Sequence, residues 1–297
     1  MNEKQTILVT GATGLVGQAL CAALQQRGHM VRTLSRSESG DFRWDVDAGE
    51  LSLAALEGVD AVVHLAGESV AQRWSEAAKA RIMDSRVGST KLLVDHILAL
   101  ESKPAFICAS GTNYYGYDLD EVVDESAPSG AGFLAEVCRA WEGAAQPLSD
   151  GSVRTVFMRT GIVLSTKGGA LAKMLTPFKL GLGGRIGDGK QLMSCVGLPD
   201  LVAMYVRAVE DDSIEGGVNA VAPEPVTNRV FTKALGKVLG RPTIFPLPEK
   251  VVQAIFGDMA DETLLADVGV LPKQLQMHDF VWQAPKLEQI MSEALEA

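Results

Sequence analysis

The sequence predicts an α/β fold, a doubly wound parallel sheet with helices on both faces, and three observations predict it. Short apolar and β-branched runs alternate with segments of helical periodicity, the runs are apolar at nearly every position, and a glycine-rich turn follows the first run. Alternating strands and helices are typical of right-handed βαβ crossovers. Continuous apolar strands are typical of a parallel sheet that is buried on both faces.

The first half of the chain divides into strands and helices in a regular order. Residues 6–10 (TILVT) form the first expected strand, and the helical pattern of 15–26 ends just before Gly28, a residue type typical of helix ends. Further strands are expected at 30–34, 61–66, 105–110 and 154–158, and further helices at 75–100 and 132–145.

The pattern changes after about residue 165. The stretch GLGGRIGDGK (181–190) lacks periodicity, and short helices and strands follow it. Pro199 and Asp200 predict the start of a helix, because proline is favoured in the first helical turn. We expect one domain at 1–240, with substrate-lobe segments from about residue 165, and a smaller C-terminal α/β lobe at 247–297.

Composition limits the classes of partner. The 297 residues carry a formal net charge of −10, which argues against nucleic-acid binding through bulk charge. The four cysteines are scattered without metal spacing, and no apolar run is long enough for a membrane span. We therefore expect a cytoplasmic protein with no metal, no nucleic-acid partner and no membrane partner; a homodimer is an open option.

A glycine motif joins the first strand to the first helix. Gly11, Gly14 and Gly17 have the spacing G-x-x-G-x-x-G within TILVTGATGLVGQAL. Glycines allow a tight turn and close approach of the backbone to a pyrophosphate, and the N–H groups of the helix start bind it. The context of strand, turn and helix predicts a Rossmann-type dinucleotide site. Its cofactor-contacting residues also include Thr13, Leu15 and Val16.

The end of the second strand predicts which dinucleotide binds. An NAD site usually places an acidic residue there to bind the ribose 2′-hydroxyl, whereas this chain has Ser35 and Arg36. A hydroxyl and a guanidinium suit a 2′-phosphate, so we predict NADP(H). The alternative is that Arg36 is a solvated surface charge. Trp44 and Asp45, which come after the third strand, are candidates to contact the adenine, or Trp44 simply packs.

The motifs together resemble the extended short-chain dehydrogenase/reductases of the NAD(P)-dependent epimerase/dehydratase superfamily. The resemblance is carried by the glycine motif and by HLAGE (64–68), ASGTNYYG (109–116) and RTGIVL (159–164). WEGAA (141–145), the 168–191 stretch and NRVFTKALGKVLGRP (228–242) resemble its atypical sugar-nucleotide-epimerase-like, or SulA-like, subgroup. Members of this subgroup carry a C-terminal extension domain, which the resemblance places at about 247–297.

The resemblance implies where the cofactor contacts lie. The loop after the fourth strand, with Leu65, Ala66, Gly67 and Glu68, is expected along the cofactor. Arg159, Thr160 and Gly161 are expected near the nicotinamide. Ser110 matches the serine of the fifth strand, which in the family lies four residues before a tyrosine that is followed by glycine. Ser110 lies four residues before Tyr114, but the glycine, Gly116, follows Tyr115. A second alignment, shifted by one residue, therefore places Gly111 at the serine position.

The resemblance also shows what is missing. The superfamily carries Tyr-x-x-x-Lys on the helix after the fifth strand, where the lysine lowers the tyrosine pKa so that the phenol can exchange a proton. Alignment on Glu142 places Leu134 at the tyrosine position and Cys138 at the lysine position. Leucine transfers no proton, and cysteine supplies no cation, so the usual acid–base pair is absent while cofactor binding, with Cys138 nearby, is retained.

Other residues are candidates to replace the pair. Ser110, Tyr114 and Tyr115 lie beside the expected nicotinamide edge, where a tyrosine either donates a proton or packs. Glu68 either binds a substrate hydroxyl or is a helix-terminal charge. Cys138 is either a redox-sensitive thiol or an apolar filler.

Three cations suggest an anionic substrate group. Arg159 ends a strand, and Arg185 and Lys190 lie in the glycine-rich loop, a setting that suits an anion or is simply a flexible surface loop. In 193–202 the subgroup's histidine is absent and Asp200 remains.

Two hypotheses about function follow from these observations. The first is an NADP(H)-dependent, epimerase-like oxidoreductase with an unidentified small-molecule substrate, and the second is a non-catalytic NADP(H)-binding sensor or regulator.

Overall fold

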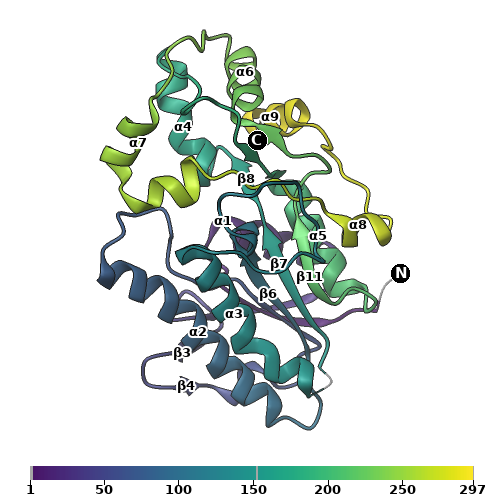
Figure 1. Ribbon diagram of the computed structural model, residues 1–297. Coiled ribbons are helices and arrows are strands. Elements are labelled where there is room, and N and C mark those ends of the chain that lie inside the picture. The colour runs from purple at the N-terminus through teal and green to yellow at the C-terminus, as the bar shows by residue number, and fades with distance from the viewer. Residues whose placement is uncertain (1–2, 152, 297) are drawn as a thin grey trace.

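The computed structural model describes residues 3–151 and 153–296. Its centre is an eight-stranded sheet in the order β11-β7-β6-β5-β1-β2-β3-β4. Neighbouring strands pair in parallel, except that β4 is antiparallel to β3. The strand order runs outward from β1 in both directions (Figure 1). This confirms the predicted doubly wound, Rossmann-type α/β class.

Five of the eight strands match an expected range to within two residues at each end, and the other three, β3, β4 and β11, had no expected range. The bounds of the eight strands are β1 (Thr6–Thr10), β2 (Met30–Ser35), β3 (Phe42–Asp45), β4 (Glu50–Leu51), β5 (Ala61–His64), β6 (Ala105–Gly111), β7 (Thr155–Thr160) and β11 (Gly216–Ala220). Strand β5 ends at His64, two residues before the expected end, because 65–68 leave the sheet as a loop. The central strand β1 is buried on both faces, with Ile7, Leu8 and Val9 fully covered.

Four helices cover the two faces of the sheet. Helices α1 (Leu15–Gln26) and α5 (Leu198–Glu210) pack on the face of Ile7 and Val9, and α2 (Glu76–Leu98) and α3 (Phe133–Asp150) pack on the opposite face. Figure 1 shows α2 and α3 side by side. Ser75 caps α2 by accepting the backbone N–H of Ala78 at 3.2 Å. Within the described residues, no helix has the length and apolar character that a membrane crossing requires.

The second half of the chain builds a lobe above the sheet edge. Its elements are β8 (Ile162–Ser165), α4 (Gly169–Lys179), β9 (Leu192–Met193), β10 (Cys195–Gly197), β12 (Val226–Thr227) and α6 (Asn228–Leu239). Strands β8 and β10 pair in parallel, and β9 and β12 are antiparallel. Helix α6 ends at Gly240, whose φ of 62° is left-handed, a conformation that glycine adopts without steric cost.

The C-terminal segment packs against earlier elements along its length. It comprises α7 (Glu249–Phe256), a π-helix (Ala260–Leu264), α8 (Lys273–Met277) and α9 (Leu287–Glu296). Leu275 joins the core of α1 and α5, and α9 shares a core with α4 and α6. Helix α5 begins where Pro199 and Asp200 predicted it, and the Asp200 carboxylate accepts the backbone N–H groups of 283–284. The domain boundary near residue 247 stays a prediction.

Candidate functional site

The glycine turn between β1 and α1 cannot accept side chains. Gly11 has a φ of +68°, and a Cβ there would lie 2.8 Å from the carbonyl carbon of Leu65. A Cβ on Gly17 would lie 2.3 Å from the Gly11 carbonyl oxygen, so α1 starts in direct contact with the turn. The turn therefore leaves bare backbone at the sheet edge, as the glycine motif predicted.

The start of α1 is open to an anion. Its N-cap, Gly14, supplies no side-chain cap, and the first turn contains no acidic residue. The first N–H groups of a helix have no intrahelical partner, so those of Leu15 and Val16 are available next to the turn. Thr13 lies in the turn itself, where its carbonyl accepts Gln18 Nε2 at 2.8 Å. Together these groups fit a pyrophosphate.

A group of hydroxyls lies at the end of β2. Ser35 Oγ is 3.3 Å from both Ser37 Oγ and Ser39 Oγ, and Arg36 is exposed beside them. Hydroxyls and a guanidinium suit the 2′-phosphate expected here. The sequence did not indicate that Ser37 and Ser39 lie beside Ser35, because a sequence does not show how a loop folds back on a strand end.

Trp44 and Asp45 differ in their surroundings. The Trp44 ring is 4% exposed and lies edge-on to His64, with centroids 6.1 Å apart, so it is part of the core. Asp45 is exposed, and its Oδ1 accepts the backbone N–H groups of Asp47 and Ala48. An adenine contact from Asp45 stays a prediction.

Thr10 holds the loop after β5 against the glycine turn. Its Oγ1 accepts the backbone N–H groups of Leu65 at 3.1 Å and Ala66 at 3.2 Å, and lies 2.7 Å from His64 Nδ1. Because Thr10 already accepts two protons, we assign its own proton to Nδ1. His64 is then a neutral ring whose Nε2–H faces Ser89 Oγ at 3.1 Å.

We expect His64 to make the protein less stable in acid. Burial, and then the charge of Arg86, lower its pKa to about 3, whereas an unfolded histidine titrates near pH 6.5. Below that pH the unfolded chain binds more protons, so the free energy of unfolding falls as the pH falls towards 3. Between pH 7 and 5, wild type should lose about 2 kcal/mol that His64→Gln does not lose. Urea unfolding at both pH values measures this difference.

The control for that prediction is His96→Gln, which changes a histidine whose Nδ1 lies 2.8 Å from the Leu92 carbonyl oxygen on α2. This variant should retain the wild-type loss. An equal loss in wild type and His64→Gln would contradict a neutral, buried His64.

An arginine that the sequence analysis did not identify supports the same loop. Arg86, from the middle of α2, donates to the Glu68 carbonyl at 3.0 Å and stacks on the Trp141 ring at 4.9 Å. A Cβ on Gly67 would lie 3.1 Å from the Cζ atom of Arg86. Burial lowers the pKa of Arg86. The sequence of α2 does not distinguish Arg86 from an arginine on the surface, because the role of Arg86 depends on the 65–68 loop, which folds over it.

Ser110 and Arg159 belong to a buried polar network. They are paired positions on β6 and β7, and both face Glu142 on α3. Arg159 donates to Glu142 Oε1 at 2.9 Å and Oε2 at 2.8 Å, and Ser110 donates to Oε1 at 2.7 Å. Arg159 Nη1 also donates to Tyr115 Oη at 2.9 Å. Glu142, which served only to align the helix, is thus the centre of the network.

The two tyrosines have different environments. Tyr115 is 2% exposed and donates to Asn219 Oδ1 at 2.8 Å. Burial raises its pKa to about 12, against the lowering effect of Arg159. Its hydroxyl is thus occupied on both sides. Tyr114 is half-buried, and its ring lies under the Arg159 guanidinium at 3.5 Å.

Arg159, Arg185 and Lys190 do not form one anion site. Arg159 is buried with Glu142, whereas Lys190 is 80% exposed and pairs with Asp188 at 3.3 Å. Arg185 is also exposed. The sequence hypothesis of a shared site is therefore wrong for this grouping, because strand β7 points Arg159 towards α3.

The segment after β7 approaches the second lobe closely. Thr160 Oγ1 donates to the Met158 carbonyl at 3.1 Å. A Cβ on Gly161 would lie 2.3 Å from the Ser194 carbonyl oxygen, so this position accepts no side chain. These residues end β7 at the same sheet edge as the glycine turn, which is where ligands bind in open α/β sheets.

The first turns of α3 carry Leu134 and Cys138, which the alignment places at the tyrosine and lysine positions of the acid–base pair. Leu134 is 5% exposed and Cys138 is 7% exposed. Burial, and then the charge of Glu142, raise the pKa of Cys138 to about 11, so its thiol stays protonated at neutral pH. A Cβ on Gly111 would be 3.5 Å from Cys138 Sγ. Neither side chain provides acid–base chemistry.

A carboxylate from the C-terminal segment caps α3. Glu262, in the π-helix, accepts the backbone N–H of Phe133 at 2.8 Å and of Leu134 at 2.7 Å. A carboxylate at a helix N-terminus is favoured by the helix dipole. The sequence could not identify Glu262, because the two segments are 128 residues apart.

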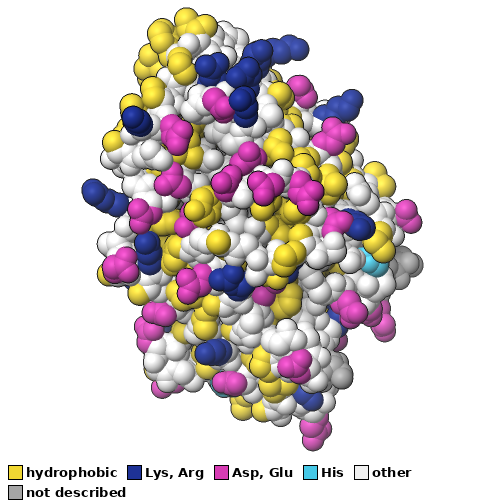
Figure 2. Space-filling model, in the orientation of Figure 1, with side chains coloured by type: hydrophobic (Ala, Val, Ile, Leu, Met, Phe, Trp, Pro, Cys, Tyr) yellow, Lys and Arg dark blue, Asp and Glu magenta, His cyan; other side chains and the backbone are white. Residues whose placement is uncertain are grey.

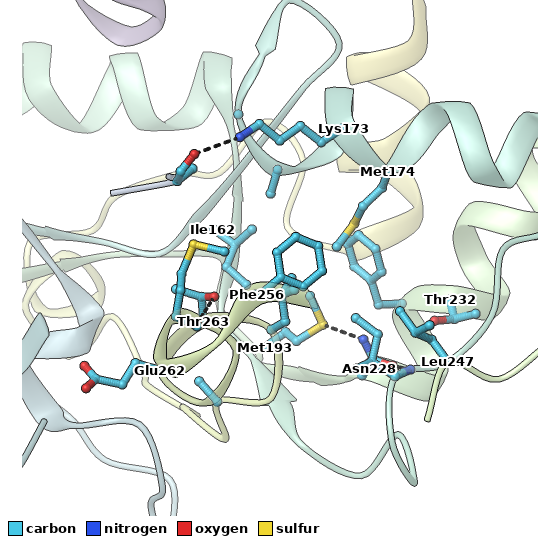
Figure 3. Close-up of a pocket in the computed structure, with 18 of the residues that line it drawn as sticks. Ile162, Lys173, Met174, Met193, Asn228, Thr232, Leu247, Phe256, Glu262 and Thr263 are labelled. Atoms are coloured by element: carbon cyan, nitrogen blue, oxygen red, sulfur yellow. Dashed lines mark hydrogen bonds between the residues drawn. The ribbon is translucent and has the colours of Figure 1, made fainter. Parts of the chain in front are cut away.

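A cavity of about 1100 Å³ separates the sheet edge from the second lobe (Figure 3). Its sheet-edge side is lined by residues 69–73 after β5 and by Thr112 and Asn113 after β6. Its other walls come from α4, α6, α7 and the π-helix. Figure 3 shows Ile162, Met193 and Phe256 close together in this space. A large pocket beside a predicted nucleotide site is the expected place for a substrate.

The fold and the glycine turn place the chain among the Rossmann-type α/β proteins. The model of the NAD dependent epimerase/dehydratase family matches residues 7–221, and the chain belongs to this family. A second model, a domain of unknown function called DUF1731, matches residues 247–294.

Similar proteins are found across distant organisms. The epimerase family protein Mb2239 of Mycobacterium bovis is 41% identical over 278 residues, which cover 92% of each chain. The human epimerase family protein SDR39U1 is 37% identical and covers 97% of this chain and 98% of its own. The crystal structure of human SDR39U1 (isoform 2) with NADPH superposes with a TM-score of 0.90 at 35% identity, covering 98% of this chain and 99% of that one.

More distant structures share the fold. Thermus thermophilus UDP-glucose 4-epimerase, crystallised with NAD, has a TM-score of 0.77 at 19% identity and covers 98% of this chain and 99% of that chain. The family models and the relatives above 30% identity confirm the resemblance that the sequence motifs carried.

Proposed function

We propose that this protein binds NADP(H) and acts as an epimerase-like oxidoreductase on a small molecule. The observation that carries the proposal is the bare glycine turn against the uncapped start of α1, where a Cβ on Gly17 would lie 2.3 Å from the Gly11 carbonyl oxygen. Such a turn lets a ligand contact the backbone directly, and the N–H groups of the helix start suit its phosphates. The NADPH in the crystal structure of human SDR39U1 supports the same cofactor.

The predicted residues divide among the parts of the cofactor. Gly11, Gly14 and Gly17 would hold the pyrophosphate, and Ser35 with Arg36 the 2′-phosphate. The backbone of 65–68, together with 159–161, would follow the cofactor towards its nicotinamide. When bound, the nicotinamide supplies or accepts a hydride.

Among the side chains at the sheet edge, Tyr114 is the best candidate for proton transfer. The hydroxyls of Ser110 and Tyr115 already donate to Glu142 and Asn219. The Tyr114 ring is held in place by the Arg159 guanidinium, which lies 3.5 Å from the ring centroid. Among the described residues, no hydrogen bond holds the Tyr114 hydroxyl, whereas the Tyr115 hydroxyl contacts both Asn219 and Arg159.

The test of the function is a turnover screen on the NADPH-saturated protein. Aldehydes, ketones and sugar nucleotides are offered, and oxidation of NADPH or reduction of NADP⁺ is followed by absorbance. We expect turnover with one of these classes. Tight NADPH binding without turnover of any class would contradict an enzymatic role.

The second candidate is a non-catalytic NADP(H) sensor. Its supporting observation is that Leu134 and Cys138, at the positions of the usual acid–base pair, are buried and lack suitable chemistry. A partner protein whose binding changes with NADPH would support it.

We expect Arg36→Asp to discriminate between the two dinucleotides. The substitution replaces the guanidinium at the end of β2 with a carboxylate that repels a 2′-phosphate, so NADPH affinity should fall by about 10- to 100-fold. NADH affinity should change little. Calorimetric titration of both cofactors measures the difference. Lys233→Asp, the same charge change at an exposed position of α6, is the control, and equal losses for NADPH and NADH would show that Arg36 does not contact the phosphate.

A further inference from the structure

The large cavity has mostly apolar walls and a few charged residues. Its charged lining residues are Arg73, Lys173 and Glu262. Lys173 reaches from α4 to the loop after β5, where its Nζ donates to the Ala71 carbonyl at 3.3 Å (Figure 3). The Glu262 carboxylate is occupied by the backbone N–H groups that start α3. The cavity therefore offers two cations beside the sheet edge.

The part of the cavity among α4, α6 and α7 is mostly hydrocarbon, with Asn228 and Thr232 of α6 as polar members of its lining. Met174 and Phe178 of α4, Phe231 of α6 and Phe256 of α7 line it, and Figure 3 shows Met174 and Phe256 inside the same space. An anion placed against these walls would lose its hydration without a partner, which is costly. An apolar chain would instead gain free energy in proportion to the area that it buries.

The rim of this part is also apolar. Leu182, Phe245 and Ile255 line the cavity and are 60%, 54% and 59% exposed. Figure 2 shows hydrophobic side chains gathered at the top of the molecule, in the region where Figure 1 places α4, α6 and α7. Exposed apolar groups that continue into a cavity are typical of an entrance for an apolar ligand.

We propose that the cavity binds an amphipathic molecule with a hydrocarbon chain and one anionic end group, of the fatty-acid type. The chain lies among α4, α6 and α7, and the anionic end faces Lys173 and Arg73 at the sheet edge. The volume of about 1100 Å³ exceeds what a compact sugar needs and is at the upper end of small-molecule pockets. That this ligand is also the substrate rests on the proposed function, whereas its binding is tested independently of any reaction.

The test is calorimetric titration of the full-length protein with hexanoate, octanoate, decanoate and dodecanoate, with and without saturating NADPH. Affinity should rise by about fourfold for each added methylene group until the chain fills the cavity. UDP-glucose is titrated as the competing class. Equal affinities along the series, or tighter binding of UDP-glucose than of dodecanoate, would overturn the proposal.

Variants locate the site. Phe256→Asp and Met174→Asp each place a carboxylate in the apolar wall, and each should weaken dodecanoate binding at least tenfold while leaving NADPH affinity unchanged. Val281→Asp makes the same kind of change at a side chain that is 84% exposed and outside the cavity lining, and should change neither affinity. Dodecanoate binding that survives both wall variants would also overturn the proposal.

The two proposals fail separately. A protein that does not bind NADPH contradicts the proposed function, while the titrations without NADPH still decide the inference. A protein that binds NADPH but prefers UDP-glucose contradicts the inference alone.

Discussion

Gly17→Ala should abolish measurable NADPH binding. The new Cβ would lie 2.3 Å from the Gly11 carbonyl oxygen and 2.8 Å from Ala12 Cα, so α1 must move away from the glycine turn. That movement withdraws the first N–H groups of the helix from the pyrophosphate site. We expect a loss of at least about a hundredfold in affinity, together with about 1–3 kcal/mol in the free energy of unfolding from overpacking. Calorimetry and urea unfolding measure the two effects.

Gly143→Ala is the matched control. Gly143 lies inside α3, and a Cβ there meets nothing within 4 Å. Alanine in a helix interior should stabilise the protein by about 0.5–1 kcal/mol and leave NADPH affinity unchanged. If Gly17→Ala bound NADPH as wild type does, the glycine turn would not be the pyrophosphate site.

Glu142→Gln should be among the most destabilising single substitutions. It leaves the Arg159 guanidinium buried without its counter-charge, whereas in the wild type two hydrogen bonds of 2.8 and 2.9 Å hold the pair together. Burial alone lowers the pKa of Arg159, and Glu142 outweighs that effect, so the pKa lies above its usual value. Breaking a buried pair from one side costs about 3–5 kcal/mol. Urea unfolding at neutral pH measures the loss.

Two further variants separate charge from packing. The double variant Glu142→Leu/Arg159→Met removes both charges, so it should recover a large part of the lost stability. Lys190→Ala removes one partner of an exposed pair with Asp188 and should leave the unfolding midpoint unchanged, because exposed pairs contribute little. A Glu142→Gln variant as stable as wild type would contradict a buried ion pair.

The buried network limits the chemistry available at the sheet edge. Ser110, Tyr115 and Arg159 were singled out as site residues, and the structure brings them together. They contact Glu142 and one another inside the fold, however, with hydroxyls and guanidinium already paired. This arrangement supports a role in holding β6, β7 and α3 in register beside the site, and it leaves Tyr114 as the more accessible aromatic residue.

Much of the fold could be predicted because its signals are local. The glycine motif requires a strand before it and a helix after it, and the apolar runs identify the buried strands. The helix at 15–26 matches α1, and the strand at 6–10 matches β1. The ends of strands were less certain. Strand β5 ends at His64 because the next residues, Leu65 and Ala66, donate their N–H groups to Thr10, a residue far away in the chain.

The missing acid–base pair at Leu134 and Cys138 is what the family resemblance implies, and it stays a prediction. The sequence by itself determined the α/β class and the glycine turn. Each depends on residue types within a short stretch, whose backbone or chemical limits are intrinsic. Only the tertiary structure decided that Arg159 pairs with Glu142 rather than with a ligand, and that Glu262 caps α3. Those contacts join side chains from separate elements, and their partners are set by the direction in which each strand or helix points them.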